Sequence, residues 1–193
     1  PPRSTLFPYT TLFRSGDAYL SDATSVQAWA SANRQMILTL AAAAAADIVG
    51  ASMCPSSVID SPHNTIGIER HGGEELVVHR KSAARARMGE PVLIAGSAAT
   101  FSVHAEGLGC GGSLESCAHG AGRELARSAA ARRFGAREVA RQYGAVVFDR
   151  RLADRLRDEA PDSYRDLRPV LKAQRDLART VRRLEPLLSF KGV

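Results

Sequence analysis

Residues 90–107 read EPVLIAGSAATFSVHAEG, and this stretch sets the expected class of the fold. A short apolar run lies on each side of the Gly96–Ser97 pair, a pattern typical of two β-strands joined by a glycine-containing turn. NTIGIERH, from Asn64, and EELVVHRK, from Glu74, have the same character. The sequence therefore predicts several short strands linked by tight turns.

Three helical segments are expected around these strands. The first starts at Ser21 or Asp22 and is marked at helical spacing by Val26, Trp29, Ala30, Asn33, Ile37 and Leu40. The apolar run MILTLAAAAAA, residues 36–46, is too short to span a membrane and is expected to form the buried side of this helix.

A second helix is expected directly after Gly122, over RELARSAAARRF, and a last long one over residues 167–184, ended by Pro186. GAVVFD, residues 144–149, suggests one further strand. The expected class is α+β: mixed short strands with a long N-terminal helix and C-terminal helices.

The net charge of +6 is distributed unevenly along the chain. Residues 1–119 contain 8 Lys and Arg against 10 Asp and Glu, whereas residues 120–193 contain 18 against 10. Such a basic C-terminal part suits a polyanion such as RNA, although a solvated helix surface has the same composition. Three cysteines, Cys54, Cys110 and Cys117, have neither zinc-site nor disulfide spacing, which favours reduced thiols and a cytoplasmic location.

Residues 1–15, PPRSTLFPYTTLFRS, fit neither a signal peptide nor a structural period. They look like translated sequencing-adapter read-through with a repeated TLF. We expect them to lie outside the fold, and the natural sequence to begin at Gly16, in the middle of a protein.

HGAGR, residues 119–123, is the motif that most strongly suggests chemistry. Small residues let a phosphate approach the main chain, and a helix N-terminus supplies free N–H donors. A neutral imidazole is a good nucleophile toward phosphorus, so His119 is a candidate nucleophile and Arg123 a candidate phosphate ligand. The alternative is a glycine-rich helix entry with an incidental histidine.

Three other stretches have polar residues that a core does not require. His63 and Asn64 stand at the entrance to a strand, where a hydrogen-bonded turn is the alternative. Gly96 and Ser97 can present N–H and hydroxyl groups to phosphate, or form an ordinary turn. Lys191 lies near the C-terminus, where a lysine is usually solvated.

Taken in order, these stretches resemble the C-terminal part of the RtcB family of RNA-splicing ligases. The resemblance covers residues 16–192 and rests on YLSDATSVQAWASANR, HNTIGIE, VVHRK, GSAATFSVHAEG, HGAGR, EAPDSYRD and the closing KG. It implies a GTP- and Mn²⁺-dependent ligase of tRNA processing and RNA repair. That enzyme joins an RNA 3′-phosphate or 2′,3′-cyclic phosphate to a 5′-hydroxyl, in some cases with archease as a helper.

The resemblance also implies roles for individual residues. His119 would be the nucleophile that carries GMP, and His63 a manganese ligand. Contacts with the guanine nucleotide would come from His63, Asn64, Ala95, Gly96, Ser97, Ala98, Ser102, His119, Gly120, Ala121, Gly122 and Lys191. Lys191 would reach the guanine base.

Four positions depart from the family pattern: Ser82 and Ala99 replace glycines, Arg165 a lysine and Ala126 a serine. The family's other manganese ligands, a Cys, an Asp and two His, belong to an N-terminal half that this sequence lacks. Three hypotheses follow: part of such a ligase, inactive alone; a divergent paralogue that guanylylates another terminal phosphate; or a basic RNA-binding remnant. If the resemblance were illusory, a histidine phosphotransfer domain would be the alternative.

Overall fold

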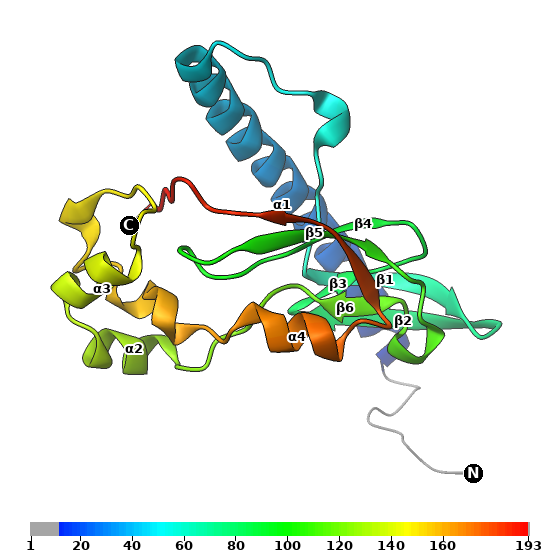
Figure 1. The fold of residues 1–193 in the computed structure, drawn as a ribbon. Coiled ribbons are helices and arrows are strands. Elements are labelled where there is room, and N and C mark those ends of the chain that lie inside the picture. Colours follow the sequence, from blue (N-terminus) through cyan, green and yellow to red (C-terminus); the bar gives the residue numbers. More distant parts are fainter. Residues whose placement is uncertain (1–11, 193) are drawn as a thin grey trace. The chain divides into compact units, whose positions relative to one another are not determined.

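The computed structural model describes residues 12–192, with side chains from residue 16 onward. The chain divides into two compact units, residues 1–81 and 82–193. One long helix is followed by short helices and antiparallel strands (Figure 1), which confirms the expected α+β class. The expectation that residues 1–15 play no part in the fold mostly concerns residues outside this description. Helix α1 (Leu12–Val49) includes the last four of them.

Helix α1 is tied to the rest of the first unit by polar contacts. The Gln27 side chain donates to the carbonyl of Ile66 (3.1 Å) and accepts from its amide (3.0 Å). Arg34 makes a two-pronged ion pair with Asp60, at 2.8 and 2.9 Å. These contacts explain how a helix with little buried apolar surface is joined to strand β1 (Asn64–His71).

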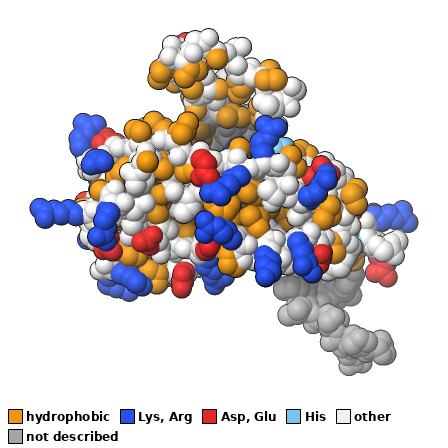
Figure 2. All heavy atoms as spheres, in the orientation of Figure 1, with side chains coloured by type: hydrophobic (Ala, Val, Ile, Leu, Met, Phe, Trp, Pro, Cys, Tyr) orange, Lys and Arg blue, Asp and Glu red, His pale blue; other side chains and the backbone are white. Residues whose placement is uncertain are grey.

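The alanine-rich run of α1 does not form a buried face, so that expectation is wrong. Met36, Ile37 and Leu40 are 65%, 58% and 66% exposed, and apolar atoms are visible at the surface along this helix (Figure 2). The run satisfies helix propensity, because alanine is the best helix former, without any packing partner within the unit. Among residues 12–192 no helix is long and apolar enough to cross a membrane.

Strands β1 and β2 (Glu74–Lys81) form an antiparallel hairpin with Asn64 opposite Lys81 and His71 opposite Glu74. Gly72 and Gly73 both have positive φ, which the tight turn of such a hairpin requires. A 3₁₀ turn (Pro55–Ser57) lies between α1 and the hairpin. The two predicted strands are therefore confirmed.

The second unit contains two small sheets. Strands β4 (Pro91–Ile94), β5 (Ser102–Gly107) and β7 (Ala178–Leu184) form an antiparallel sheet in the order β4-β5-β7. Strands β3 (Ala83–Arg85) and β6 (Ser116–Ala118) pair with each other. The hairpin expected from residues 90–107 is thus confirmed as β4 and β5, with Val92 opposite Ala105.

Two hydrophobic clusters support the second unit. The first contains Ala84, Ala86, Val92, Ile94, Phe101, Val103, Ala105, Cys117, Ala121, Leu167 and Ala178. The second contains Ala130, Phe134, Val139, Tyr143, Leu156 and Ala160. Helices α2 (Arg127–Arg133) and α3 (Ala136–Gln142) and a series of 3₁₀ turns (Gly111–Ser113, Arg150–Leu152, Arg157–Glu159 and Pro161–Ser163) complete the unit.

The long helix predicted over residues 167–184 is wrong. Helix α4 (Leu167–Ala173) ends after seven residues, and the chain turns at Gln174 into strand β7 (Figure 1). Gln174 is 5% exposed and its side chain accepts from the Ala118 amide at 2.8 Å, which holds the turn in place. The open edge of β5 then takes up residues 178–184 as a strand.

The strand suggested for GAVVFD is also wrong. Its Val147 forms one isolated bridge to the C-terminal segment. The Val147 amide donates to the Leu187 carbonyl at 2.9 Å, and the Val147 carbonyl accepts from the Ser189 amide at 2.8 Å. Phe148 instead stacks on Tyr143 with ring centroids 4.0 Å apart. Packing of these two rings, rather than strand pairing, determines the local conformation.

Candidate functional site

The HGAGR motif lies against the end of strand β4. Ala95 donates its amide to the His119 carbonyl at 2.9 Å, and Ala121 donates its amide to the Ala95 carbonyl at 2.8 Å. A Cβ on Gly120 would stand 2.8 Å from that same carbonyl oxygen, so only glycine permits this approach. Two stretches that the sequence singled out, IAGSAATFS and HGAGR, are thus hydrogen-bonded to each other through Ala95.

The His119 ring is oriented by the main chain of Ser82. Its Nδ1 lies 2.7 Å from the Ser82 carbonyl oxygen. Because a carbonyl oxygen can only accept, the neutral ring carries its proton on Nδ1 and its lone pair on Nε2. This tautomer makes Nε2 the nucleophilic nitrogen, as in sites where a second hydrogen bond fixes the orientation of a histidine.

Ser82 adopts the left-handed conformation, with φ of 56°. A residue with a Cβ is strained there by about 1–2 kcal/mol, whereas glycine is not. The sequence has serine here where the family that it resembles has glycine, and the positive φ explains why glycine suits the position. The strained residue is the one whose carbonyl holds His119.

Replacing Ser82 with glycine is therefore expected to stabilise the protein. We expect a gain of about 0.5–1 kcal/mol in the free energy of unfolding, since relief of strain exceeds the extra flexibility of the unfolded chain. Urea titration measures it. Ser128→Gly, at an exposed position of α2, is the control and should lower stability by a similar amount. A loss of stability in Ser82→Gly would contradict the argument.

Helix α2 does not begin at HGAGR, contrary to expectation. Glu124 and Leu125 both donate their amides to the Ser163 carbonyl, at 2.8 and 3.2 Å, and the helix starts only at Arg127. Residues 124 and 125 form a bend at the Ser163 carbonyl, and their amides are used there before a helix can form. His119 is therefore not at a helix N-terminus, and the helix dipole supplies nothing to it.

Arg123 points into a polar cluster rather than toward a phosphate position. Its guanidinium donates to the carbonyls of Leu125 (3.0 Å) and Asp158, and to the Tyr164 hydroxyl (3.1 Å). It also lies over the Tyr164 ring, 4.9 Å from the centroid, and 3.5 Å from Glu159. The expected role of Arg123 as a phosphate ligand is therefore not supported.

Glu159 lies at the centre of this cluster. The Glu159 carboxylate accepts from the Tyr164 hydroxyl at 2.6 Å and from the Lys191 ammonium at 2.8 Å. Arg127 is a further ion-pair partner. Burial raises the pKa of Glu159, but the hydrogen bonds from Lys191 and Tyr164 and the nearby cations outweigh it, so its pKa lies below the usual value.

This lowered pKa predicts a pH dependence of stability. A carboxyl group whose pKa is lower in the folded than in the unfolded protein stabilises fully above the unfolded pKa, about 4.3 for glutamate, and loses that contribution as pH falls. We expect the wild-type melting temperature to fall more steeply than that of Glu159→Gln between about pH 5 and 3. Parallel curves of melting temperature against pH would contradict this assignment.

The turn after β4 is closed by its own hydroxyls. The Gly96 amide donates to Ser102 Oγ at 3.1 Å, and the Ser97 amide donates to Thr100 Oγ1 at 2.7 Å. The N–H groups expected to be open to a phosphate are thus already bonded. A ligand at this turn would meet the hydroxyls of Ser97 and Thr100, which lie 3.0 Å from each other.

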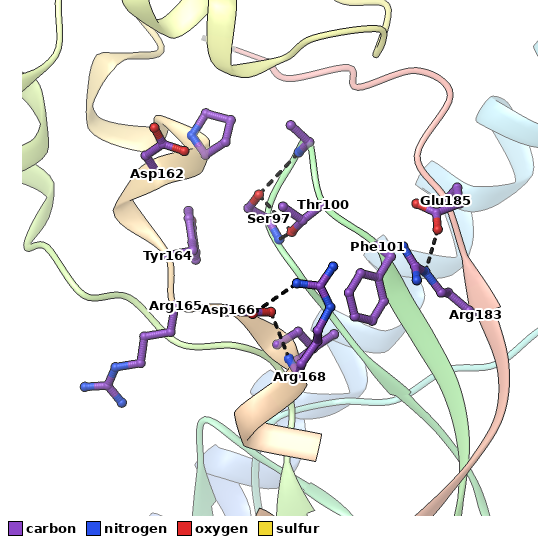
Figure 3. A pocket seen from close by; sticks show the side chains of 13 residues that line it. Ser97, Thr100, Phe101, Asp162, Tyr164, Arg165, Asp166, Arg168, Arg183 and Glu185 are labelled. Carbon is purple, nitrogen blue, oxygen red and sulfur yellow. Dashed lines mark hydrogen bonds and ion pairs between the residues drawn. The ribbon is translucent and has the colours of Figure 1, made fainter. Parts of the chain in front are cut away.

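A pocket of about 390 Å³ opens beside this turn (Figure 3). Ser97 and Thr100 face Asp162 and Tyr164 across it, and Phe101 lies between the side chains of Arg168 and Arg183. Its lining residues are Ser97, Ala99, Thr100, Phe101, Pro161, Asp162, Tyr164, Arg165, Asp166, Leu167, Arg168, Arg183 and Glu185. Donors, acceptors and ring faces together suit a polar, planar ligand better than a purely apolar one.

The structure groups only part of the expected site. Within the second unit, hydrogen bonds connect Ala95 with His119 and Ala121, which flank Gly120, and Gly96 with Ser102. Ser97 lines the pocket, which His119 does not. His63 and Asn64 are exposed at the start of β1 in the first unit, and their convergence with His119 stays a prediction.

Sequence reasoning missed three features of this region: the Ser82 carbonyl, Glu159 and Tyr164. Glu159 and Tyr164 belong to EAPDSYRD, which supported the family resemblance but was given no role. The pattern of a glutamate, a proline and a tyrosine was the available signal. The part played by a main-chain carbonyl has no sequence signal at all.

Comparison with known proteins gives a consistent answer. A family described as tRNA-splicing ligase RtcB matches residues 1–192. The RNA-splicing ligase RtcB of Escherichia coli K12 is 34% identical over 189 residues, covering 93% of this chain and 46% of that protein. The protein of the same name from Mycobacterium tuberculosis H37Rv is 33% identical, covering 92% and 45%. The tRNA-splicing ligase RtcB of Methanopyrus kandleri is also 33% identical, covering 85% and 20%.

These relatives are all described as RNA-splicing or tRNA-splicing ligases. The chain belongs to the RtcB family, and the resemblance seen in its sequence is confirmed. It spans about half the length of the bacterial relatives it matches.

Proposed function

We propose that this chain is the C-terminal part of an RNA ligase that joins a 3′-phosphate or 2′,3′-cyclic phosphate end to a 5′-hydroxyl end through a guanylylated His119. The observation that carries the proposal is the hydrogen bond from His119 Nδ1 to the Ser82 carbonyl. It leaves the lone pair on Nε2, as attack on a phosphorus atom requires. The Gly120 and Gly122 positions beside it supply a main chain without side-chain obstruction.

In the proposed reaction His119 Nε2 attacks the α-phosphorus of GTP, forming a P–N bond while pyrophosphate leaves. A 2′,3′-cyclic phosphate end is first hydrolysed: water adds to the phosphorus, the bond to the 2′-oxygen breaks, and a 3′-phosphate remains. An oxygen of the RNA 3′-phosphate then takes the GMP from His119, and the P–N bond breaks. The 5′-hydroxyl attacks the activated RNA phosphate, and GMP leaves. Ala95, Gly96, Ser97, Ala98, Ser102, Asn64 and Lys191 are the proposed contacts of the nucleotide, with Lys191 at the guanine base.

The net positive charge of the C-terminal part supports RNA as the partner, although the charge is spread over the surface. Basic side chains lie interspersed with acidic ones on the visible face, rather than gathered in one patch (Figure 2). Arg151, Arg168 and Arg179 pair with Asp149, Asp166 and Glu106 respectively. Residues 120–193 nevertheless contain 18 basic against 10 acidic residues, and this net positive charge favours a polyanion as the partner.

The residues of this chain do not fit a complete manganese site. Across residues 12–192 no group of three or more His, Cys, Asp or Glu side chains is arranged to hold a metal ion. His63 is the one proposed ligand, and a single imidazole leaves the rest of the coordination to water. No step of the proposed reaction is therefore derived through a metal on this chain.

The chain alone is accordingly expected to bind Mn²⁺ weakly and to form no GMP adduct. Divalent sites gain affinity from the number of ligands and from preset geometry, both of which are lacking here. Isothermal titration with Mn²⁺ should show no saturation at micromolar metal. Tight, His63-dependent binding, or a His119–GMP adduct from this chain alone, would show that a second half is dispensable.

The proposed nucleotide site is tested by NMR titration of the chain with GMP and with AMP. GMP is expected to shift the amide signals of residues 95–98 and 119–122 more than AMP does. Absence of any GMP-dependent shift at these residues would overturn the proposed site. In a chimera with the N-terminal half of the E. coli relative placed ahead of Gly16, labelled GTP should give an acid-labile, alkali-stable adduct that His119→Ala abolishes. An adduct without RNA joining would favour the divergent paralogue.

A further inference from the structure

Glu159 stands out among the acidic residues because it is buried among several cations. It ends the 3₁₀ turn Arg157–Glu159, and its side chain is 8% exposed. A carboxylate in such a place is costly unless cations and hydroxyls compensate its charge. The partners of the Glu159 carboxylate therefore indicate its role.

Each carboxylate oxygen of Glu159 has two partners. Oε2 accepts from Lys191 Nζ at 2.8 Å and from the Tyr164 hydroxyl at 2.6 Å. Oε1 pairs with the guanidinium groups of Arg123, at 3.5 Å, and Arg127. Oε1 accepts no hydrogen bond within geometric limits, but it is buried, and the whole side chain is 8% exposed. A nucleotide base therefore cannot reach Glu159, and any effect on a ligand must pass through these partners.

Lys191 depends on Glu159 more than the other partners do. Arg123 is also held by main-chain carbonyls and by the Tyr164 ring. Within residues 12–192, Glu159 is the only hydrogen-bond or ion-pair partner of the Lys191 ammonium. The segment that leads to Lys191 is joined by main-chain bonds only as far as Ser189, through Val147. Glu159 thus fixes the Lys191 ammonium at the end of a C-terminal segment that has few other contacts beyond Ser189.

We propose that Glu159 is a positioning residue that sets guanine recognition by holding the Lys191 ammonium in place. The inference rests on the proposed function, in which Lys191 meets the guanine base. An ammonium has three N–H donors, and one is given to Glu159. The remaining two suit the O6 and N7 acceptors of guanine, whereas adenine offers a donor at N6 in place of O6. An ammonium held in position therefore selects guanine, and a mobile one does not.

The first measurement concerns Lys191 itself. The sequence has only three lysines, Lys81, Lys172 and Lys191, so ¹³C-dimethylation of the chain gives a simple methyl NMR spectrum. Lys191→Met assigns the signal of interest. In wild type it should differ from that of Lys172, and Glu159→Gln should move it to the position of a solvated lysine. Asp158→Asn is the matched control: it removes the neighbouring carboxylate, which pairs with Arg127, and should leave the Lys191 signal unchanged.

The second measurement compares GMP with AMP binding by calorimetry. Glu159→Gln and Lys191→Met should each weaken GMP binding about tenfold, the effect of one lost hydrogen bond to a charged group, and leave AMP unchanged. The double variant should be no weaker than Lys191→Met alone, because Glu159 acts through Lys191. Glu159→Asp, which keeps the charge but shortens the side chain, should be intermediate and replaces Glu159→Gln should that variant fail to fold.

The outcomes separate this inference from the proposed function. A Lys191 signal that ignores Glu159, or an additive double variant, overturns the positioning role while GMP binding stands. A chain that does not bind GMP overturns the proposed nucleotide site and this inference together. GMP binding that is unchanged after Lys191→Met overturns the guanine contact of Lys191, and this inference with it, while the proposed role of His119 stands. Loss of GMP preference together with the signal change, in Glu159→Gln and not in Asp158→Asn, is the result we expect.

Discussion

Replacing Gly96 with alanine is expected to lower the free energy of unfolding by about 3 kcal/mol, the upper end of overpacking effects. A Cβ on Gly96 would lie 2.2 Å from the Phe101 carbonyl oxygen and 2.6 Å from Thr100 Oγ1. The closest atom is main chain, so it cannot rotate away as a side chain could. Relief requires the turn to open, which breaks the bond from the Gly96 amide to Ser102 Oγ.

Thermal melting measures the effect, and a fall of about 6–12 °C is expected for a chain of this length. Gly67→Ala is the matched control, because a Cβ there meets nothing within 4 Å and the residue lies in strand β1. It should leave the melting temperature unchanged or raise it slightly. GMP-induced NMR shifts at residues 95–98 should disappear in Gly96→Ala and persist in Gly67→Ala. Equal melting temperatures for the two variants would show that the turn is looser than its contacts indicate.

The strands could be predicted from sequence because their signal is local. NTIGIERH, EELVVHRK and EPVLIAG combine β-branched residues with flanking turn glycines, and each became a strand. The prediction of a long C-terminal helix was wrong because the spacing of Leu177, Val181 and Leu184 fits a helical period, although most of this segment forms strand β7. What decided between them was the free edge of β5 and the buried Gln174 side chain, neither of which is visible in a local window.

The same division applies to the candidate site. The motifs around His119 and Gly96 could be found because glycine and histidine in apolar surroundings are conspicuous, and the structure joins them through Ala95. The conformation after Gly122 could not be foreseen. RELAR has good helix propensity, yet the Ser163 carbonyl, about 40 residues away in sequence, takes the amides of Glu124 and Leu125. These tertiary hydrogen bonds outweigh the helix propensity of the segment. The helix therefore starts too late for its dipole to act at His119.

Arg123 illustrates how the contacts of a residue can favour a role other than the one that its motif suggests. Next to a glycine-rich loop an arginine suggests phosphate binding, but its guanidinium is occupied by Leu125, Asp158, Tyr164 and Glu159. Its geometry is that of a brace between the HGAGR loop and the EAPDSYRD segment. Removing a residue that connects two segments lowers mainly the stability of the protein. Removing a residue that binds phosphate lowers mainly the affinity for the ligand.

Replacing Arg123 with alanine is therefore expected to destabilise the protein by about 2–3 kcal/mol, because Arg123 is partly buried and the effect stays below that of a fully buried ion pair. The Glu159 carboxylate loses one compensating cation, and the Asp158 and Leu125 carbonyls lose their donor. Chemical denaturation measures the change. Arg141→Ala is the control, because that arginine is 81% exposed and pairs only within α3, so its loss should cost less than about 0.5 kcal/mol.

A second substitution tests the cause of this loss. If the cost of Arg123→Ala arises largely from uncompensated charge on Glu159, then Glu159→Gln in the same chain should recover part of the stability, and the two changes will not be additive. Arg123→Lys should fall between wild type and alanine, since an ammonium keeps the charge but cannot reach Leu125, Tyr164 and Asp158 together. A variant Arg123→Ala that keeps its stability but loses GMP binding would show instead that Arg123 serves the nucleotide directly, and that the brace is incidental.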